Sequence, residues 1–155
     1  METLTIRTGV QADAPVIADF NALMALETEG RQLDASTLLR GVEAVLGDPS
    51  KGMYYVAEIG GNIAGQLMIT YEWSDWRNGT FWWIQSVYVK KEYRNQGVFR
   101  SLYRHVEDLA RQHGTVCGLR LYVDARNDRA KEAYRSLGLR QASYEVFEVD
   151  FVLKP

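Results

Sequence analysis

The sequence predicts an α/β (α+β) fold, in which a mixed, mostly antiparallel central sheet carries helices on both of its faces. Strand-like and helix-like stretches follow one another in the order β, α, α, β, β, β, α, β, α, β along 155 residues. The middle strands are joined by short turns, which favours antiparallel pairs, whereas the later strands alternate with helices. The length suits one domain, spanning residues 1–155.

One strand and two helices come first. Residues 4–7 alternate apolar and polar side chains as a short strand does. Asp-Ala-Pro at 13–15 is typical of a helix start, and the acidic, glycine-broken stretch Glu27–Gly30 should end this helix. Ser36 is expected to cap a second helix, which Gly-Asp-Pro at 47–49 stops.

The next part of the chain predicts three strands. Residues 54–59 and 63–71 are rich in β-formers, and Gly-Gly-Asn at 60–62 accepts the positive φ of a tight hairpin turn. A polar loop with two tryptophans is expected at 73–79. Residues 81–89 are so apolar and aromatic that they predict a central strand.

Helices and strands alternate in the last third of the chain. Apolar residues at helical spacing predict helices over 98–113 and 127–137, each followed by a glycine that suits a C-terminal cap. Alternating side chains predict a strand at 117–123 and a last strand at 144–151.

Composition excludes several classes of protein. With 18 basic and 20 acidic side chains the net charge is −2, which gives no overall attraction to nucleic acid or an anionic membrane. We therefore expect neither as a partner. No basic and apolar leader follows Met1, no run approaches a membrane span, and the single Cys117 suits a reducing compartment, so we expect a cytoplasmic protein. His105 and His113 lack ligand-spaced partners, so we expect no metal.

The most informative stretch joins the strand at 81–89 to the helix at 98–113 through Asn95, Gln96 and Gly97. The first turn of a helix has N–H groups without intrahelical partners and a partial positive charge, and glycine lets the chain approach a phosphate closely. The stretch therefore predicts an anion site. Basic side chains around it form a local cationic cluster: Lys90, Lys91, Arg94, Arg100 and Arg104. Neither a P-loop nor a GxGxxG follows a strand, which disfavours nucleotide hydrolysis and hydride transfer.

Two stretches of the sequence carry motifs, YRNQGVFRSLY at 93–103 and NDRAKEAYRSLGL at 127–139. The first resembles the acyl-coenzyme A motif RxxGxG/A of the GNAT superfamily of N-acetyltransferases, and the second resembles its NxxAxxxYxxxGF signature. The preceding WWIQSVYV resembles its fourth strand, and the order of elements is also the family's. Two departures stand out. Phe99 replaces a second small residue, and Gln85 and Trp83 lie where the family often has a glutamate base.

The resemblance implies acetyl-CoA as co-substrate and a set of residues that hold it. The pyrophosphate would be bound at the turn and the helix start, by residues Arg94, Asn95, Gln96, Gly97, Val98, Phe99, Arg100 and Ser101, chiefly through the amides from Gln96 onward. The pantetheine arm would pair with the backbone of Val87, Tyr88 and Val89 and with Asn127. An amide near Val87 would polarise the thioester carbonyl, and Tyr134 would be the catalytic acid beside the sulfur.

The implied reaction is direct attack of a primary amine, of a small molecule or a protein, on the thioester in a ternary complex. Deprotonating an alkylamine of pKa about 10.4 at pH 7 costs about 4 to 5 kcal/mol, so a base is needed. Glu27, Glu29, Glu72 and Asp75 are the candidates, and Glu27, Glu29 and Asp75 are also expected to bind a cationic acceptor. The alternatives are a non-catalytic CoA-binding module and, less favoured, a nucleic-acid binder. Many relatives dimerise, so a homodimer is also expected.

Overall fold

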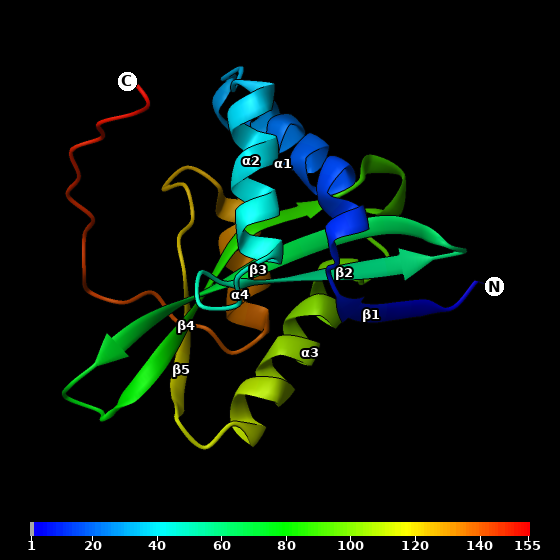
Figure 1. The fold of residues 1–155 in the computed structure, drawn as a ribbon. Coiled ribbons are helices and arrows are strands. Elements are labelled where there is room, and N and C mark those ends of the chain that lie inside the picture. The colour runs from blue at the N-terminus through cyan, green and yellow to red at the C-terminus, as the bar shows by residue number, and fades with distance from the viewer. Residues whose placement is uncertain (1) are drawn as a thin grey trace. The chain divides into compact units, whose positions relative to one another are not determined.

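The computed structural model describes residues 2–155, which form two compact units divided between Tyr122 and Val123. The first unit holds the sheet and the helices α1, α2 and α3 (Figure 1). The second unit holds α4 and the C-terminal segment.

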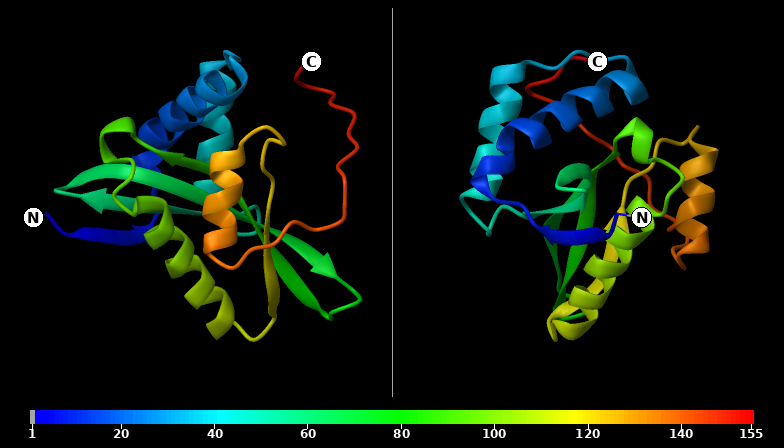
Figure 2. Two further views of the ribbon diagram at one scale, coloured as in Figure 1. Left: turned by 180° about the vertical axis from the view of Figure 1, so that it is seen from behind. Right: turned by 90° about the vertical axis from the view of Figure 1, so that its right-hand side faces the viewer.

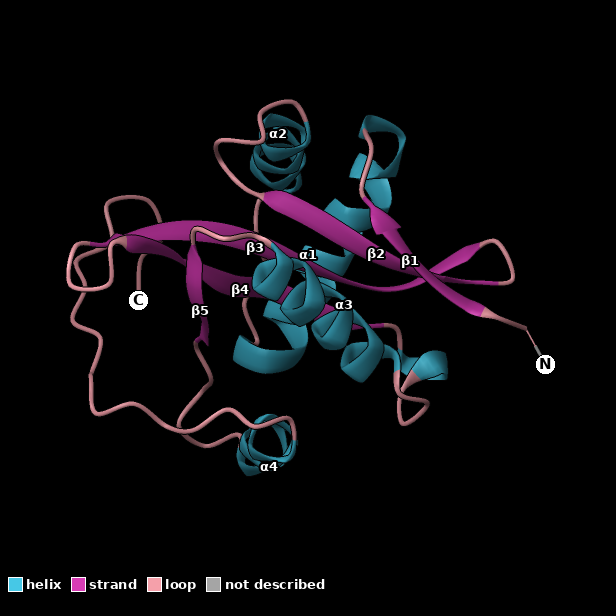
Figure 3. Cartoon of the chain, turned by 90° about the horizontal axis from the view of Figure 1, so that it is seen from below, coloured by secondary structure: helices cyan, strands magenta, loops and turns pink. Residues whose placement is uncertain are grey.

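The sheet of the first unit has five strands in the order β1-β2-β3-β4-β5 among the described residues (Figure 3). The first three neighbouring pairs are antiparallel, whereas β4 and β5 are parallel. The predicted mixed, mostly antiparallel sheet is therefore confirmed. The strands are β1 Leu4–Thr8, β2 Met53–Ile59, β3 Asn62–Ser74, β4 Gly79–Val89 and β5 Val116–Leu121.

Helices cover both faces of this sheet, as Figure 2 shows: α1 (Ala14–Glu29) and α2 (Ala35–Leu46) lie on one side, and α3 (Val98–Gln112) lies on the other. Successive side chains of β2 point to opposite faces of the sheet and pack against the helices on each face. Tyr54 and Val56 belong to the buried cluster with α1 and α2, whereas the ring of Tyr55 contacts His105 of α3 at 5.5 Å.

The helix ends follow local chemistry. Pro15 lies in the first turn of α1, and Gly30 ends the helix in the left-handed region at φ 61°. The predicted cap of α2 at Ser36 is wrong. Asp34 caps this helix by accepting the amide of Thr37 at 2.8 Å, since its carboxylate reaches the N3 amide from one turn earlier.

The second unit consists of α4 (Asp128–Ser136) and an extended tail. Asn127 caps α4, accepting the amide of Ala130 at 3.1 Å, as its position predicts. The predicted last strand at 144–151 is wrong, because this segment forms no ladder (Figure 3) and its apolar side chains are exposed. Alternation alone does not make a strand, which also needs a hydrogen-bonded neighbour and a buried face. No helix within residues 2–155 is long and apolar enough to cross a membrane.

Candidate functional site

A bulge interrupts β4 where it passes β3. Gln66 pairs with Tyr88, but Met68 pairs with Gln85, so β4 has two residues, Ser86 and Val87, opposite a single residue of β3. Ser86 has φ 52°, in the left-handed region that non-glycine residues rarely adopt. Bulges of this kind re-aim the backbone and are common next to active sites.

The opposite edge of β4 opens at the same level. The parallel ladder with β5 ends at Ile84 and Leu121, whereas β4 continues to Val89. Over residues 85–89 no strand of the described chain pairs with this edge. The backbone at 87–89, where the sequence predicts pantetheine pairing, therefore belongs to an open sheet edge, which an extended ligand can join as an extra strand.

The turn after β4 leads directly into α3. Asn95 and Gly97 both have positive φ, 62° and 77°, and Gly97 is the N-cap of α3. A Cβ built on Gly97 would meet no atom within 4 Å, so open space lies before the turn. The amide of Ser101 donates to the carbonyl of Gly97 at 3.0 Å. This N–H makes the first helical hydrogen bond of α3, and the predicted contact of Ser101 with the pyrophosphate stays a prediction.

Glu27, at the C-terminal end of α1, connects this turn to β4. Its carboxylate accepts hydrogen bonds from Arg94 at 2.8 Å and from the hydroxyl of Tyr88 at 3.3 Å. Arg94 also donates through Nε to the carbonyl of Val89 at 2.8 Å. Partial burial raises the pKa of Glu27, but the hydrogen bond and charge of Arg94 outweigh it, so the net pKa is lowered. The pKa of Tyr88 is raised mainly by its burial and, to a smaller extent, by the negative charge of Glu27.

The cationic cluster predicted from the sequence is largely neutralised by carboxylates. Besides Arg94, ion pairs link Lys91 to Glu27, Lys90 to Glu92 and Arg104 to Glu107. Arg100 is exposed and forms no ion pair within residues 2–155. Arg100 is therefore the basic side chain of this cluster whose charge no carboxylate of the described residues neutralises, and anion binding at the turn stays a prediction.

Four other predicted residues lie in different surroundings. The ring of Phe99 lies against that of Tyr103 one turn further along α3, with centroids 6.3 Å apart. Glu29 is exposed and 3.9 Å from Arg31, and Asp75 lies in the β3–β4 turn, where it accepts the amide of Trp76. Glu72, a candidate base, is engaged by Arg120 at 2.6 Å and by the indole of Trp83 at 3.1 Å.

Asn127 and Tyr134 belong to the second unit. The side-chain oxygen of Asn127 is used in capping α4, as described above. Tyr134 is partly buried, and this burial raises the pKa of its phenol, which favours the protonated form. Their contacts with a carrier stay predictions.

Sequence reasoning missed a buried polar network behind the bulge, formed by Asn21, Tyr54, Gln66 and Ser86. A signal was present, because Gln66 interrupts the otherwise apolar run at 63–69. A fully buried polar side chain needs partners, and its partners mark a feature of the fold.

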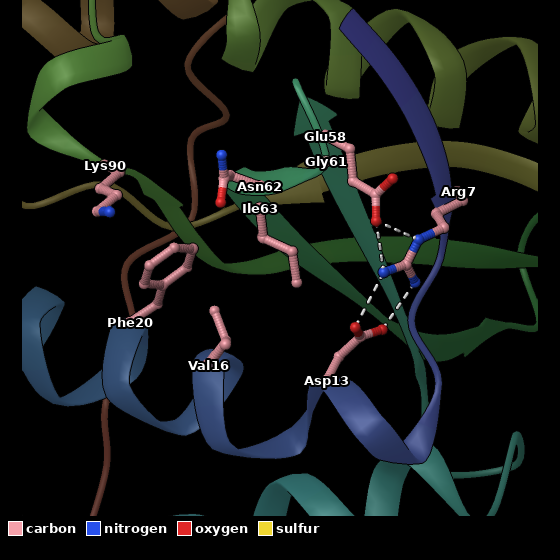
Figure 4. A pocket seen from close by; sticks show the side chains of 9 residues that line it. All are labelled: Arg7, Asp13, Val16, Phe20, Glu58, Gly61, Asn62, Ile63 and Lys90. Atoms are coloured by element: carbon pink, nitrogen blue, oxygen red, sulfur yellow. Dashed lines mark hydrogen bonds and ion pairs between the residues drawn. The ribbon is translucent and has the colours of Figure 1, made fainter.

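A separate pocket of about 350 Å³ lies between α1 and the β2–β3 turn (Figure 4). Its polar wall is an ion cluster in which Arg7 binds Asp13 at 2.7 Å and Glu58 at 2.8 Å. The hydrogen bond from Arg7 is the main reason that the pKa of Asp13 is lowered. Because these charges satisfy one another, the cluster stabilises the joining of β1, α1 and β2. No group of three or more potential metal ligands occurs in the described part of the chain.

Comparisons with known proteins agree with this geometry. The model of the acetyltransferase (GNAT) family matches residues 20–139. A solved structure described as a possible acetyltransferase from Clostridium difficile 630 is 43% identical, with a TM-score of 0.90 over 97% of this chain and 99% of that one. A predicted acetyltransferase with acetyl-CoA from Clostridium acetobutylicum shares the fold at 15% identity, with a TM-score of 0.77 over 97% of both chains.

Among curated proteins, the thialysine N-epsilon-acetyltransferase of Bos taurus is 34% identical over 76 residues. The match covers 49% of this chain and 44% of the length of that relative.

Proposed function

Because the chain belongs to the acetyltransferase (GNAT) family, and is thus an N-acetyltransferase, we propose that it moves an acetyl group from acetyl-CoA to a primary amine. The acceptor is a small molecule or a protein amine, and it attacks the thioester directly in a ternary complex. The observation that carries this proposal is the open edge of β4, with its bulge, followed at once by the Gly97 turn.

The residues present fit acetyl-CoA in two places. Open space before Gly97 leaves room for a pyrophosphate at the first amides of α3, and exposed Arg100 supplies a cation. No strand of the described chain pairs with the edge of β4 at 87–89, so this edge can receive the amides of a pantetheine arm, except at the carbonyl of Val89, which Arg94 already holds. When bound, acetyl-CoA supplies the activated acetyl group.

The bulge supports a role for the Val87 amide as the donor to the thioester oxygen. Charge accumulates on that oxygen as the amine attacks, and a fixed backbone donor stabilises it more than the ground state. Donors of this kind contribute about 3 to 4 kcal/mol where they have been removed.

Tyr134 is proposed as the acid that donates a hydrogen bond to the leaving thiolate. With ordinary pKa values, proton transfer from a phenol of pKa about 10 to a thiolate of pKa about 8.5 is uphill by about 2 kcal/mol. Burial raises the pKa of Tyr134, which keeps the phenol protonated at neutral pH and makes full proton transfer more costly, so the proposed role is donation of a hydrogen bond. Asn127 would hold the pantetheine arm, as the second motif implies.

The acceptor is proposed to be a cationic alkylamine. Glu27, Glu29 and Asp75 are the carboxylates proposed to attract it, and Glu27 is supported best because it contacts Tyr88 on β4. The name of the bovine relative describes acetylation of an ε-amine, which makes alkylamines the first class to test.

The test measures thiol release from acetyl-CoA with a panel of amines: lysine analogues, polyamines, amino acids and peptide N-termini. We expect acceptor-dependent thiol release with at least one alkylamine. Tight binding of acetyl-CoA without turnover across the panel would instead support the alternative, a non-catalytic CoA-binding module.

A further inference from the structure

We infer that Gln66 is a positioning residue for the reaction, because its side chain holds the β4 bulge in the shape that presents the Val87 amide. This inference rests on the proposed function for its kinetic consequence. Its structural part concerns residues of the first unit alone and can be tested without turnover.

Gln66 lies on β3 at the point where pairing with β4 changes register. Its side chain is fully buried, with 0% exposed. The amide nitrogen donates to the carbonyl of Ser86 at 3.1 Å and to Oδ1 of Asn21 at 2.9 Å. One side chain therefore fixes the first residue of the bulge and ties it to α1.

The network continues around the bulge through a second ring of contacts. Asn21 donates through Nδ2 to the hydroxyl of Tyr54 at 3.3 Å. Burial raises the pKa of Tyr54, so the phenol stays protonated. The carbonyl of Ser86 is thus connected through Gln66 and Asn21 to Tyr54 on β2.

The backbone of Ser86 explains why such support is needed. A non-glycine residue at φ 52° is strained, and it keeps this conformation only where its surroundings fix it. A carbonyl that accepts from Gln66 determines the plane of the following peptide, which contains the Val87 N–H. Gln66 therefore orients the proposed oxyanion donor without touching the substrate.

An unused atom of Gln66 shows that its function is not simple packing. Oε1 is buried and has no hydrogen-bond partner among the described residues. A buried acceptor without a partner is unfavourable, and an apolar side chain of similar shape would avoid it. The two hydrogen bonds that the amide nitrogen donates, one of them to the bulge, explain why a glutamine is present at this buried position.

The test is Gln66→Met, which keeps the length of the side chain and removes both donors. We expect kcat to fall about 10- to 100-fold, because small displacements of a catalytic group have effects of this size, while KM and Kd for acetyl-CoA change less than about threefold. Val42→Ala serves as the control for lost core packing, since it makes a cavity between α2 and the sheet and removes no hydrogen bond.

The outcomes separate the two proposals. A loss of kcat in Gln66→Met no larger than in Val42→Ala, or a loss carried by KM with kcat unchanged, would overturn the positioning role. If the natural protein neither binds acetyl-CoA nor turns it over, the proposed function fails on its own. A crystal structure of Gln66→Met then still decides the structural part: we expect Ser86 to leave the left-handed region, and an unaltered bulge would refute the inference.

Discussion

Replacing Gly97 by alanine separates the strain of the turn from its proposed role as an anion site. Gly97 has φ 77°, and a Cβ at this position would meet no atom within 4 Å, so the change costs backbone strain but no steric clash. An L-residue in the left-handed region costs about 1 to 2 kcal/mol, of which about 0.4 to 1 kcal/mol is offset by the stiffer unfolded chain. We expect the free energy of unfolding to fall by about 1 kcal/mol.

The chain offers a matched control at Gly30, which ends α1 at φ 61° and also has no atom within 4 Å of an added Cβ. Gly30→Ala should lose about the same stability, seen as a shift of about 2–4 °C in Tm. Only Gly97→Ala should weaken the binding of acetyl-CoA, because the added methyl group enters the space in front of the first amides of α3. Losing one charge-assisted hydrogen bond of about 1.5 to 3 kcal/mol corresponds to a 10- to 100-fold higher Kd by calorimetry. Equal Kd values for both variants would show that no phosphate binds at this turn.

Three further changes test other parts of the structure. Tyr134→Phe should lower kcat at least tenfold while Kd for acetyl-CoA stays within twofold, and unchanged turnover would remove the acid role of this phenol. Asp13→Asn should lower the free energy of unfolding at pH 7 by about 1 to 3 kcal/mol, because buried Asp13 is the main hydrogen-bonding partner of Arg7. The pKa of Asp13 is lowered in the folded protein, so its contribution to stability is present above the ordinary pKa of 3.8 and disappears as the pH falls through the folded pKa. In urea unfolding, the free energies of unfolding of the two proteins should therefore converge at acid pH. A difference that stays constant with pH would contradict this. Glu27→Gln removes a partly exposed ion pair with Arg94 and should cost no more than about 1 kcal/mol of stability. The KM for a cationic acceptor should rise several-fold, whereas the KM for acetyl-CoA should not change. A rise in the KM for acetyl-CoA alone would assign Glu27 to the turn at Gly97 instead of to acceptor binding.

Most of the fold could be predicted from the sequence because its signals are local. The apolar period of α3, the Gly-Gly-Asn turn between β2 and β3 and the cap at Asn127 each depend on neighbours along the chain. The prediction of a strand at 144–151 failed, because its alternating pattern says nothing about whether a neighbouring strand is there to pair with it. At α2 the predicted cap, Ser36, lies two residues after Asp34, the residue that caps the helix.

The candidate site was predictable in its backbone and less so in its side chains. Glycine followed by a helix indicated a turn at Gly97, and the structure places Gly97 at the start of α3 with a φ of 77°. The register shift at Ser86 has no glycine to mark it, and the pairing of Arg94 with Glu27 joins residues 67 positions apart. Contacts of this kind depend on how α1 packs on the sheet, which no short stretch of sequence determines.

The early end of the β4–β5 ladder has a consequence for handling the protein. Residues 85–89 have no strand paired along this edge within the described chain, although Arg94 already holds the carbonyl of Val89, and an edge of this kind recruits strands from neighbouring molecules. A carrier whose own amides pair with the remaining groups would act as a removable sixth strand. Purified samples should then stay monodisperse longer, and melt at higher temperature, when coenzyme A is kept in the buffer.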